Sequence, residues 1–328
     1  MEKEITKEKK SRSLVNNLLW IIVLMIVLYL FLSPIFSVGI YQLLRLLPNT
    51  SPAITFINSN YTPVLGDIIS LVIICAIFKK NRFILRSFLP KGVGKNHKNN
   101  VVEDTYEASQ ENTGRNLLTG LLLGFLTNFA CVLCAMIHGD VSFSMNFSFS
   151  MIPVLIYALL MVFIQSSAEE LWCRGFMYER ICIHYPIWVA MLVNGVFFGA
   201  LHSFNDGVTV LAIVDIIICG ISYSLLRWYT GSIWAAMGIH TMWNFTQNFI
   251  FGLPNSGLVS QVSILRLDSA SGISNLIYDY GFGVEGAIPA IIADVMISII
   301  ILVLAKKNGR LGELRMSYES KSLKSNVS

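Results

Sequence analysis

The sequence predicts an all-α polytopic membrane protein with eight transmembrane helices, and its composition and charge distribution carry this prediction. Hydrophobic residues make up 54% of the 328 residues and charged residues only 13%, whereas soluble domains carry about 25% charged residues. The mean hydropathy is +0.63. Of the 44 charged residues, 28 fall in three short segments, 2–13, 79–115 and 306–328. The long uncharged stretches between them exclude a soluble fold of one or two domains.

Eight apolar segments are long enough to be helices that cross the bilayer, which requires about 20 mainly apolar residues. They are 16–38, 61–79, 116–138, 151–182, 186–203, 208–228, 231–251 and 284–305. Outside them we expect a cytoplasmic segment 1–15, a cytoplasmic loop 80–115, an external segment 252–283 and a cytoplasmic tail 306–328. The first apolar run lacks a small-residue cleavage site, so it predicts a span and not a signal peptide.

The basic residues predict the orientation, because cytoplasmic loops carry an excess of Lys and Arg. With eight crossings and a cytoplasmic N-terminus, 22 of the 24 Lys and Arg residues lie inside, and only Arg45 and Arg266 lie outside. Seven spans or the inverted orientation scatter them more evenly. We therefore expect a multi-pass protein of a bacterial plasma membrane with both termini cytoplasmic. The basic residues flank spans and form no stripe on a folded surface, so no nucleic-acid partner is expected.

Ionisable and strongly polar residues inside spans are costly and are functional candidates by default. Six such residues, together with one phenylalanine, form three short motifs. The residues are Glu169, Glu170 and Arg174 in the fourth span, Phe198 and His202 in the fifth, and His240 and Asn244 in the seventh. Other polar residues in the spans carry no motif. The three lone aspartates Asp67, Asp215 and Asp294 are expected to make structural contacts. Cys131 and Cys134 form a C-x-x-C pattern within an apolar run, and we expect them to be buried helix residues that only fill space.

Helical spacing predicts how the motif residues face one another. Glu170 and Arg174 are four residues apart, so they share a helix face and can pair, which lowers the cost of burying both. Glu169 is rotated by about 100° from Glu170. If the fourth and fifth spans form a hairpin, Glu169 and His202 lie at matching height, each about 20–25 Å along its helix. A carboxylate and the imidazoles of His202 and His240 can therefore converge from three helices.

Such a group has the chemistry for hydrolysis of a peptide bond in a protected cavity. A carboxylate beside an imidazole can activate water. A second imidazole with an adjacent amide, as in His240 and Asn244, can stabilise the oxyanion of a tetrahedral intermediate. Each polar turn alone could be a structural contact. Three of them at compatible depth on three helices favour a catalytic site.

The motifs E-E-x-x-x-R (169–174), F-x-x-x-H (198–202) and H-x-x-x-N (240–244) resemble the CAAX prenyl protease and bacteriocin-processing family, called CPBP or Abi. Gly175 after Arg174 also fits this family. The resemblance covers about residues 150–250 and implies a catalytic core, 150–251, built from spans four to seven. It also implies an intramembrane endopeptidase that cleaves a membrane-associated protein or peptide, in CAAX-type processing, bacteriocin maturation or self-immunity.

The resemblance also implies a role for each motif residue. Carried over, it makes Glu169 the water-activating base assisted by His202, Glu170 and Arg174 a supporting pair, His240 and Asn244 the oxyanion site, and Phe198 a wall of the substrate cavity. The family was once classed with the metalloproteases, and Glu169, His202 and His240 are residue types that bind zinc. No H-E-x-x-H pattern is present, however, so the sequence favours a glutamate protease without a cofactor, with that zinc set as the alternative.

Two non-enzymatic classes are the rivals of this interpretation. A catalytically inactive member acting as a membrane immunity or scaffold protein would be expected to have lost a motif residue, and none is lost. A transporter would also place polar groups inside the membrane. Transporters often show inverted repeats or paired broken helices, and neither is visible in this sequence.

Overall fold

The computed structural model describes residues 18–27, 31–44, 46, 51–77, 88–91, 111–268, 272, 274–318 and 320, and these are mostly helical. The predicted N-terminal segment 1–15, most of the predicted loop 80–115 and the end of the predicted tail lie outside the described residues.

Four helical segments in the described part of the chain are long and apolar enough to cross a membrane. They are α6 (Gly114–His138), the continuous stretch Phe149–His184 that contains α7 (Ile152–Glu170) and α8 (Tyr178–His184), α10 (Val210–Thr230) and α12 (Ile288–Lys307). Shorter helices lie in the other predicted spans: Leu18–Val27, α2 (Ser33–Leu44), α4 (Leu65–Ile77), α9 (Ile187–His202) and α11 (Ile233–Phe245). A further short helix, α3 (Pro52–Asn60), precedes the second predicted span. The chain is therefore an integral membrane protein, and the count of eight crossings stays a prediction.

The first two predicted spans differ most from the structure. The segment 16–38 contains two helices, Leu18–Val27 and α2, and α2 continues to Leu44, beyond the predicted end. The helical region of the second begins nine residues before the predicted start, at α3, where Ser51 Oγ accepts the backbone N–H of Ile54 at 3.4 Å and Pro52 fills the first turn. A short 3₁₀ turn, Thr62–Val64, separates α3 from α4.

Local sequence signals define the ends of the longer helices. Thr113 and Thr209 begin α6 and α10, and each hydroxyl accepts a backbone N–H from three residues further on, at 3.3 and 3.1 Å. Gly139 and Gly231 end the same helices with φ angles of 90° and 65°, a conformation that glycine adopts without strain.

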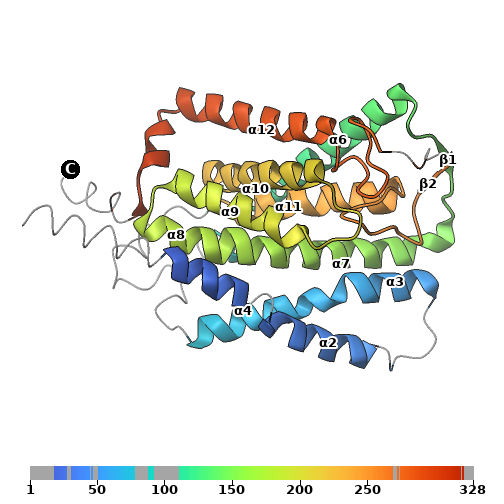
Figure 1. The fold of residues 1–328 in the computed structure, drawn as a ribbon, viewed down its shortest axis with the longest axis horizontal. Helices are drawn as coiled ribbons and strands as arrows, with labels where there is room; N and C mark the ends of the chain where they lie inside the picture. The colour runs from blue at the N-terminus through green and yellow to red at the C-terminus, as the bar shows by residue number, and fades with distance from the viewer. Residues whose placement is uncertain are drawn as a thin grey trace, which may run out of the picture.

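The two ends of the helical bundle differ in character (Figure 1). At one end, which we call the ladder end, β1 (Phe143–Met145) pairs antiparallel with β2 (Leu265–Leu267). The helices α9 and α10 stop short of this end, which α6 and α7 reach, and the irregular segment 252–287 lies there. At the opposite end, which we call the basic end, lie the α8–α9 and α10–α11 turns and the last turn of α12, with Lys306 and Lys307.

The beginning of the predicted C-terminal tail is part of the packed structure. Leu311–Arg315 forms a 3₁₀ helix, and the buried Tyr318 donates its hydroxyl to Glu179 Oε2 at 2.7 Å. Arg227 Nη2 donates to the other oxygen of the same carboxylate at 2.5 Å. A tail of mixed polar sequence gives no signal of this contact, because its partners lie on two distant helices.

Glycines allow α6 and α11 to pack with their backbones in close contact, as small residues do in membrane helix pairs. A Cβ on Gly120 would lie 2.1 Å from Ala235 O, and one on Gly124 would lie 2.3 Å from Ile239 O. The same pattern holds from the other side, where a Cβ on Gly238 would lie 2.6 Å from Leu117 O. This contact fixes the position of α11, which carries two of the predicted site residues.

We expect Gly124→Ala to lower the thermal unfolding midpoint of the detergent-solubilised protein by several degrees. The added methyl group forces the two backbones apart, and overpacking of this kind costs about 1–3 kcal/mol. Gly114→Ala is the matched control on the same helix, because no atom lies within 4 Å of the Cβ position there. Equal midpoints for the two variants would contradict this account of the packing.

Candidate active site

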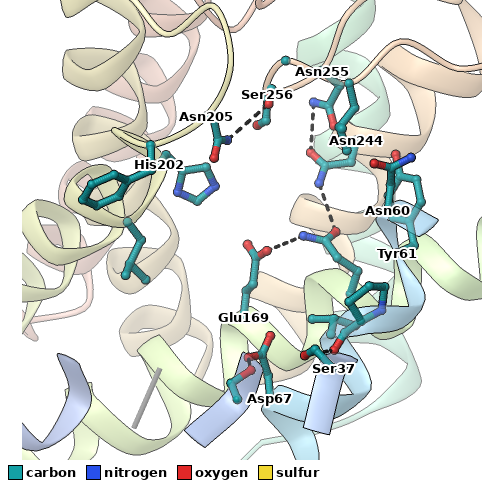
Figure 2. Close-up of a pocket in the computed structure, with 18 of the residues that line it drawn as sticks. Ser37, Asn60, Tyr61, Asp67, Glu169, His202, Asn205, Asn244, Asn255 and Ser256 are labelled. Carbon is teal, nitrogen blue, oxygen red and sulfur yellow. Dashed lines mark hydrogen bonds between the residues drawn. The ribbon is translucent and has the colours of Figure 1, made fainter. Parts of the chain in front are cut away.

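A cavity of about 600 Å³ lies between α2, the α3–α4 region, α7, α9, α11 and the loop 255–258. Four of the predicted site residues line it: Glu169, His202, His240 and Asn244. Figure 2 shows the His202 ring across an open space from Glu169 and Asn244. The structure therefore brings together residues from three helices that are far apart in sequence.

Glu169 presents one carboxylate oxygen without a hydrogen-bond partner. Its Oε1 accepts a hydrogen bond from Gln165 Nε2, one helical turn earlier on α7. Its Oε2 is buried, has no hydrogen-bond partner among the described residues and lies 3.8 Å from His240 Nε2. An unpaired buried acceptor is costly, and here it borders a cavity that can admit water.

The Glu170 side chain is fully buried and contacts Arg174 and His240. Its Oε1 accepts from Arg174 Nη1 at 2.9 Å and lies 3.0 Å from His240 Nδ1. The predicted pairing of Glu170 with Arg174 is thus present. The guanidinium of Arg174 also donates to Gly220 O at 3.1 Å and stands over the Phe198 ring at 4.4 Å.

The helix changes its winding directly after these carboxylates. Leu171–Met177 forms a π-helical turn between α7 and α8, where the spacing predicted a regular α-helix. Such turns often occur at functional sites. Within it, Trp172 Nε1 donates to the backbone oxygen of Asp67 at 2.9 Å, which ties α7 to α4.

His202 is the last residue of α9, and one nitrogen of its ring is hydrogen-bonded to the backbone. Its Nδ1 lies 2.8 Å from the backbone oxygen of Phe198, which can only accept, so Nδ1 carries the proton. In the neutral ring Nε2 is then the acceptor. The ring also packs 4.5 Å from that of Phe198, which holds its orientation.

His240 and Asn244 stand on one face of α11, as their spacing predicted. His240 Nδ1 lies 3.0 Å from Glu170 Oε1, the oxygen that accepts from Arg174, and Nε2 faces Glu169. Asn244 Oδ1 accepts from Asn255 Nδ2 at 3.3 Å, so its Nδ2 donates towards Gln165 Oε1 at 3.4 Å. The amide orientation is therefore set by partners on both sides.

Residues 151–246 match the family model for Rce1-like type II CAAX prenyl endopeptidases. The Rce1-like segment contains all the motif residues, and the match confirms the resemblance to CAAX prenyl proteases that the motifs predicted. No curated protein matches the chain.

Three further polar residues extend the site beyond the motifs. A hydrogen-bonded chain runs from Glu285 Oε2 through Asn255 (2.9 Å) to Asn244, and from there through Gln165 to Glu169. Figure 2 shows the bond between Asn255 and Asn244. The i,i+4 spacing of Gln165 and Glu169 could have indicated the first of these. Asn255 and Glu285 lie in the irregular segment outside the Rce1-like segment, where no periodicity relates them to the site.

The three lone aspartates are not remote from the site. Asp67 lines the large cavity and accepts a hydrogen bond from Ser33 Oγ. Asp215 and Asp294 line a second cavity of about 30 Å³, together with Glu285, His240 and Asn244. The sequence predicts structural contacts for these three aspartates because they belong to no motif, and the folding of α4, α10 and α12 around the motif helices places them beside the site.

The sequence left zinc binding by Glu169, His202 and His240 as the alternative to a site without a cofactor. The described part of the chain contains no group of three or more His, Cys, Asp or Glu side chains that could hold a metal ion. The set Glu169, His202 and His240 is included in this finding. His240 Nδ1 lies 3.0 Å from Glu170 Oε1 and Nε2 lies 3.8 Å from Glu169 Oε2, so a zinc ion held by this set would be bound by His240 through Nε2.

We expect Glu170→Gln to destabilise the protein as well as to inactivate it. The change leaves the Arg174 guanidinium buried without a counter-charge, and breaking a buried pair costs about 3–5 kcal/mol. The thermal unfolding midpoint and the yield of folded protein measure this effect. Glu111→Gln is the control, because its pair with Lys91 (2.6 Å) is solvent-exposed, and surface pairs contribute about 0–1 kcal/mol. Equal stability of the two variants would show that the buried pair has no such role.

Proposed function

We propose that the chain is an intramembrane endopeptidase of the glutamate type that hydrolyses a peptide bond of a membrane-associated protein or peptide. The observation that carries the proposal is the unpaired Glu169 Oε2 at a cavity of about 600 Å³, opposite the His202 ring. The match of residues 151–246 to an endopeptidase family supports it.

In the first step, Glu169 and His202 activate a water molecule. Glu169 Oε2 and His202 Nε2 are both acceptors, so a water between them can donate one proton to each while its lone pair faces the substrate carbonyl. Glu169 takes a proton from the water as the oxygen bonds to the carbonyl carbon, which is general base catalysis.

The carbonyl oxygen of the substrate becomes an oxyanion, which hydrogen-bond donors must stabilise. Asn244 Nδ2 is a neutral donor that lines the same cavity. His240 Nε2 lies 3.8 Å from Glu169 Oε2 and can donate a second hydrogen bond to the oxyanion when it carries a proton, while Nδ1 lies 3.0 Å from Glu170 Oε1. Glu170 and Arg174 thereby position His240 without touching the substrate. In the last step, Glu169 returns its proton to the amide nitrogen as the C–N bond breaks.

The proposal includes the arrangement predicted from the sequence: a catalytic core at 150–251, eight crossings and both termini cytoplasmic. It leaves the substrate open among CAAX-type processing, bacteriocin maturation and self-immunity. Terminal proteomics of membrane-associated peptides, from cells carrying the native protein or Glu169→Gln, identifies the cleaved bond. A new terminus that depends on Glu169 supports an enzyme. A scaffold, an immunity protein or a transporter yields none.

We expect Glu169→Gln to reduce turnover of that peptide by about 10²–10⁴-fold or more, because loss of a general base costs this much. The side chain keeps its shape and can still hydrogen-bond to Gln165, so the thermal unfolding midpoint should stay near that of the native protein. Glu313→Gln is the control, since its partner Arg310 lies near the basic end, outside the residues that line the cavity. Full activity of Glu169→Gln would refute the assignment of the base.

Turnover should also persist after treatment with a chelator. Purified protein dialysed against EDTA and verified by elemental analysis should keep its activity, because Glu169 and His202 activate the water in the proposed mechanism and no step uses a metal ion. Zinc added back should give no stoichiometric recovery. Loss of activity that zinc restores one-to-one would instead make Glu169, His202 and His240 metal ligands.

A further inference from the structure

The Glu285 carboxylate lies beside the candidate active site, and no step of the proposed reaction uses it. It belongs to the irregular segment, just before α12, and its residue is only 7% exposed. Glu285 borders the second cavity together with His202, His240 and Asn244, but it is not among the residues that line the large cavity. It can therefore affect a substrate in the large cavity only through another side chain.

Close backbone packing brings Glu285 to the loop 255–258. Gly283 has a φ of +71°, and a Cβ there would lie 2.4 Å from Pro254 O, so the chain before Glu285 lies directly against the start of that loop. In the loop, the backbone N–H of Ser256 donates to Glu285 Oε1. Ser256 has a φ of +49° and, among the described residues, is the one non-glycine with a positive φ. Such strained conformations persist where their surroundings hold them, and they cluster at functional sites.

Both oxygens of Glu285 accept hydrogen bonds, and this fixes the amide of Asn255. Ser256 N–H occupies Oε1, and Asn255 Nδ2 donates to Oε2 at 2.9 Å. An ionised carboxylate can only accept, so the NH₂ group of Asn255 and not its oxygen faces Glu285. The backbone of Asn255 is held by reciprocal hydrogen bonds with Leu258 at 2.9 and 2.8 Å. Only the side-chain amide of Asn255 is therefore left to turn.

The same nitrogen of Asn255 determines which way the Asn244 amide points. Asn255 Nδ2 also donates to Asn244 Oδ1 at 3.3 Å (Figure 2). Asn244 Nδ2 then donates to Gln165 Oε1 at 3.4 Å, and Gln165 Nε2 donates to Glu169 Oε1. Because a carboxylate stands at each end of this chain, all three amides have one consistent orientation. The second proton of Asn244 Nδ2 can then point into the large cavity, which Asn244 lines.

We propose that Glu285 is a positioning residue of the active site, whose carboxylate acts through Asn255 to hold the Asn244 amide with its donor towards the substrate oxyanion. Glu285 lies outside the Rce1-like segment 151–246, so the motifs do not include it. The role of Asn244 in the reaction rests on the proposed function. The link from Glu285 to Asn244 rests on the hydrogen bonds and can be tested without turnover.

Glu285→Gln replaces one acceptor oxygen by a donor at almost unchanged size. The backbone N–H of Ser256 cannot turn, so the new amide gives it the oxygen and turns its NH₂ towards Asn255. Asn255 must then flip to present Oδ1, and Asn244 flips in turn, which places its oxygen where the donor was. For the peptide identified by proteomics, kcat should fall by about tenfold or more, towards the 10²–10³-fold that loss of an oxyanion donor costs, with KM within about twofold.

Two further variants separate this role from a structural one. Asp279→Asn is the matched control, because Asp279 is a buried carboxylate of the same irregular segment that accepts two backbone N–H groups of its own turn at 2.8 Å. It should leave kcat unchanged. Asn255→Ala breaks the link and leaves Glu285 in place, so it should lower kcat as Glu285→Gln does. In Asn244→Ala protein, Glu285→Gln should lower kcat by less than about twofold further, because its effect passes through Asn244.

Thermal unfolding tests the link itself. The fall in unfolding midpoint caused by Glu285→Gln should be smaller by about 2 °C or more in Asn244→Ala protein than in the native background, because Asn244 no longer has to flip. Asp279→Asn should lower the midpoint equally in both backgrounds. Asn255→Ala gives the same two readouts if Glu285→Gln does not fold.

Either of two results would overturn the positioning role of Glu285. One is an additive effect of the Glu285 and Asn244 variants on the unfolding midpoint, and the other is a native kcat in Glu285→Gln and Asn255→Ala protein. Failure of the proposed function looks different. If the midpoints are coupled and Glu169→Gln protein still cleaves at the native rate, the proposed function fails and the positioning of Asn244 by Glu285 stands.

Discussion

The buried carboxylate of Glu170 is the interaction on which the rest of the site depends. One of its oxygens receives both the Arg174 guanidinium and the Nδ1 of His240, so it joins α7, the π-helical turn and α11 at a single atom. Arg174 in turn reaches Gly220 O on α10 and the Phe198 ring on α9. A buried ion pair is weak support for stability in itself. Here the pair fixes positions: its contacts hold the four helices that surround the site, α7, α9, α10 and α11, in place relative to one another.

The irregular segment 252–287 completes the site at a depth where helices would be expected. Non-helical backbone near a membrane is tolerated where protein buries it or where it lines a polar cavity. Both conditions hold. Gln247 Nε2 donates to the backbone oxygens of Pro254 and Phe282 at 2.6 and 2.9 Å, which satisfies buried backbone of the segment. Asn255, which lines the cavity, donates to Asn244 Oδ1 at 3.3 Å. The segment thus supplies a wall of the cavity that the helices α9 and α10 are too short to provide.

The wall of the cavity has two origins in the sequence. Residues 204–206 lie within the segment 151–246 that matches the Rce1-like family model, whereas residues 255–258 lie beyond it. Asn205 Nδ2 donates to Ser256 O at 3.2 Å and joins these two loops. The lining of the cavity is therefore only in part a feature of the matched segment.

The sequence by itself determined the membrane character, the α6–α12 helices to within a few residues and the identity of the motif residues. It could do so because apolar length and i,i+4 spacing are local properties. Tertiary structure alone decided that Glu169 and Glu170 both face His240, that Gln165 and Asn255 hold Asn244, and that Asp67, Asp215 and Asp294 border the two cavities. The pair Gln165 and Asn244 is 79 positions apart in the sequence, and the pair Glu170 and His240 is 70 positions apart. Helix rotation and loop packing set them, and no periodicity in the sequence encodes either.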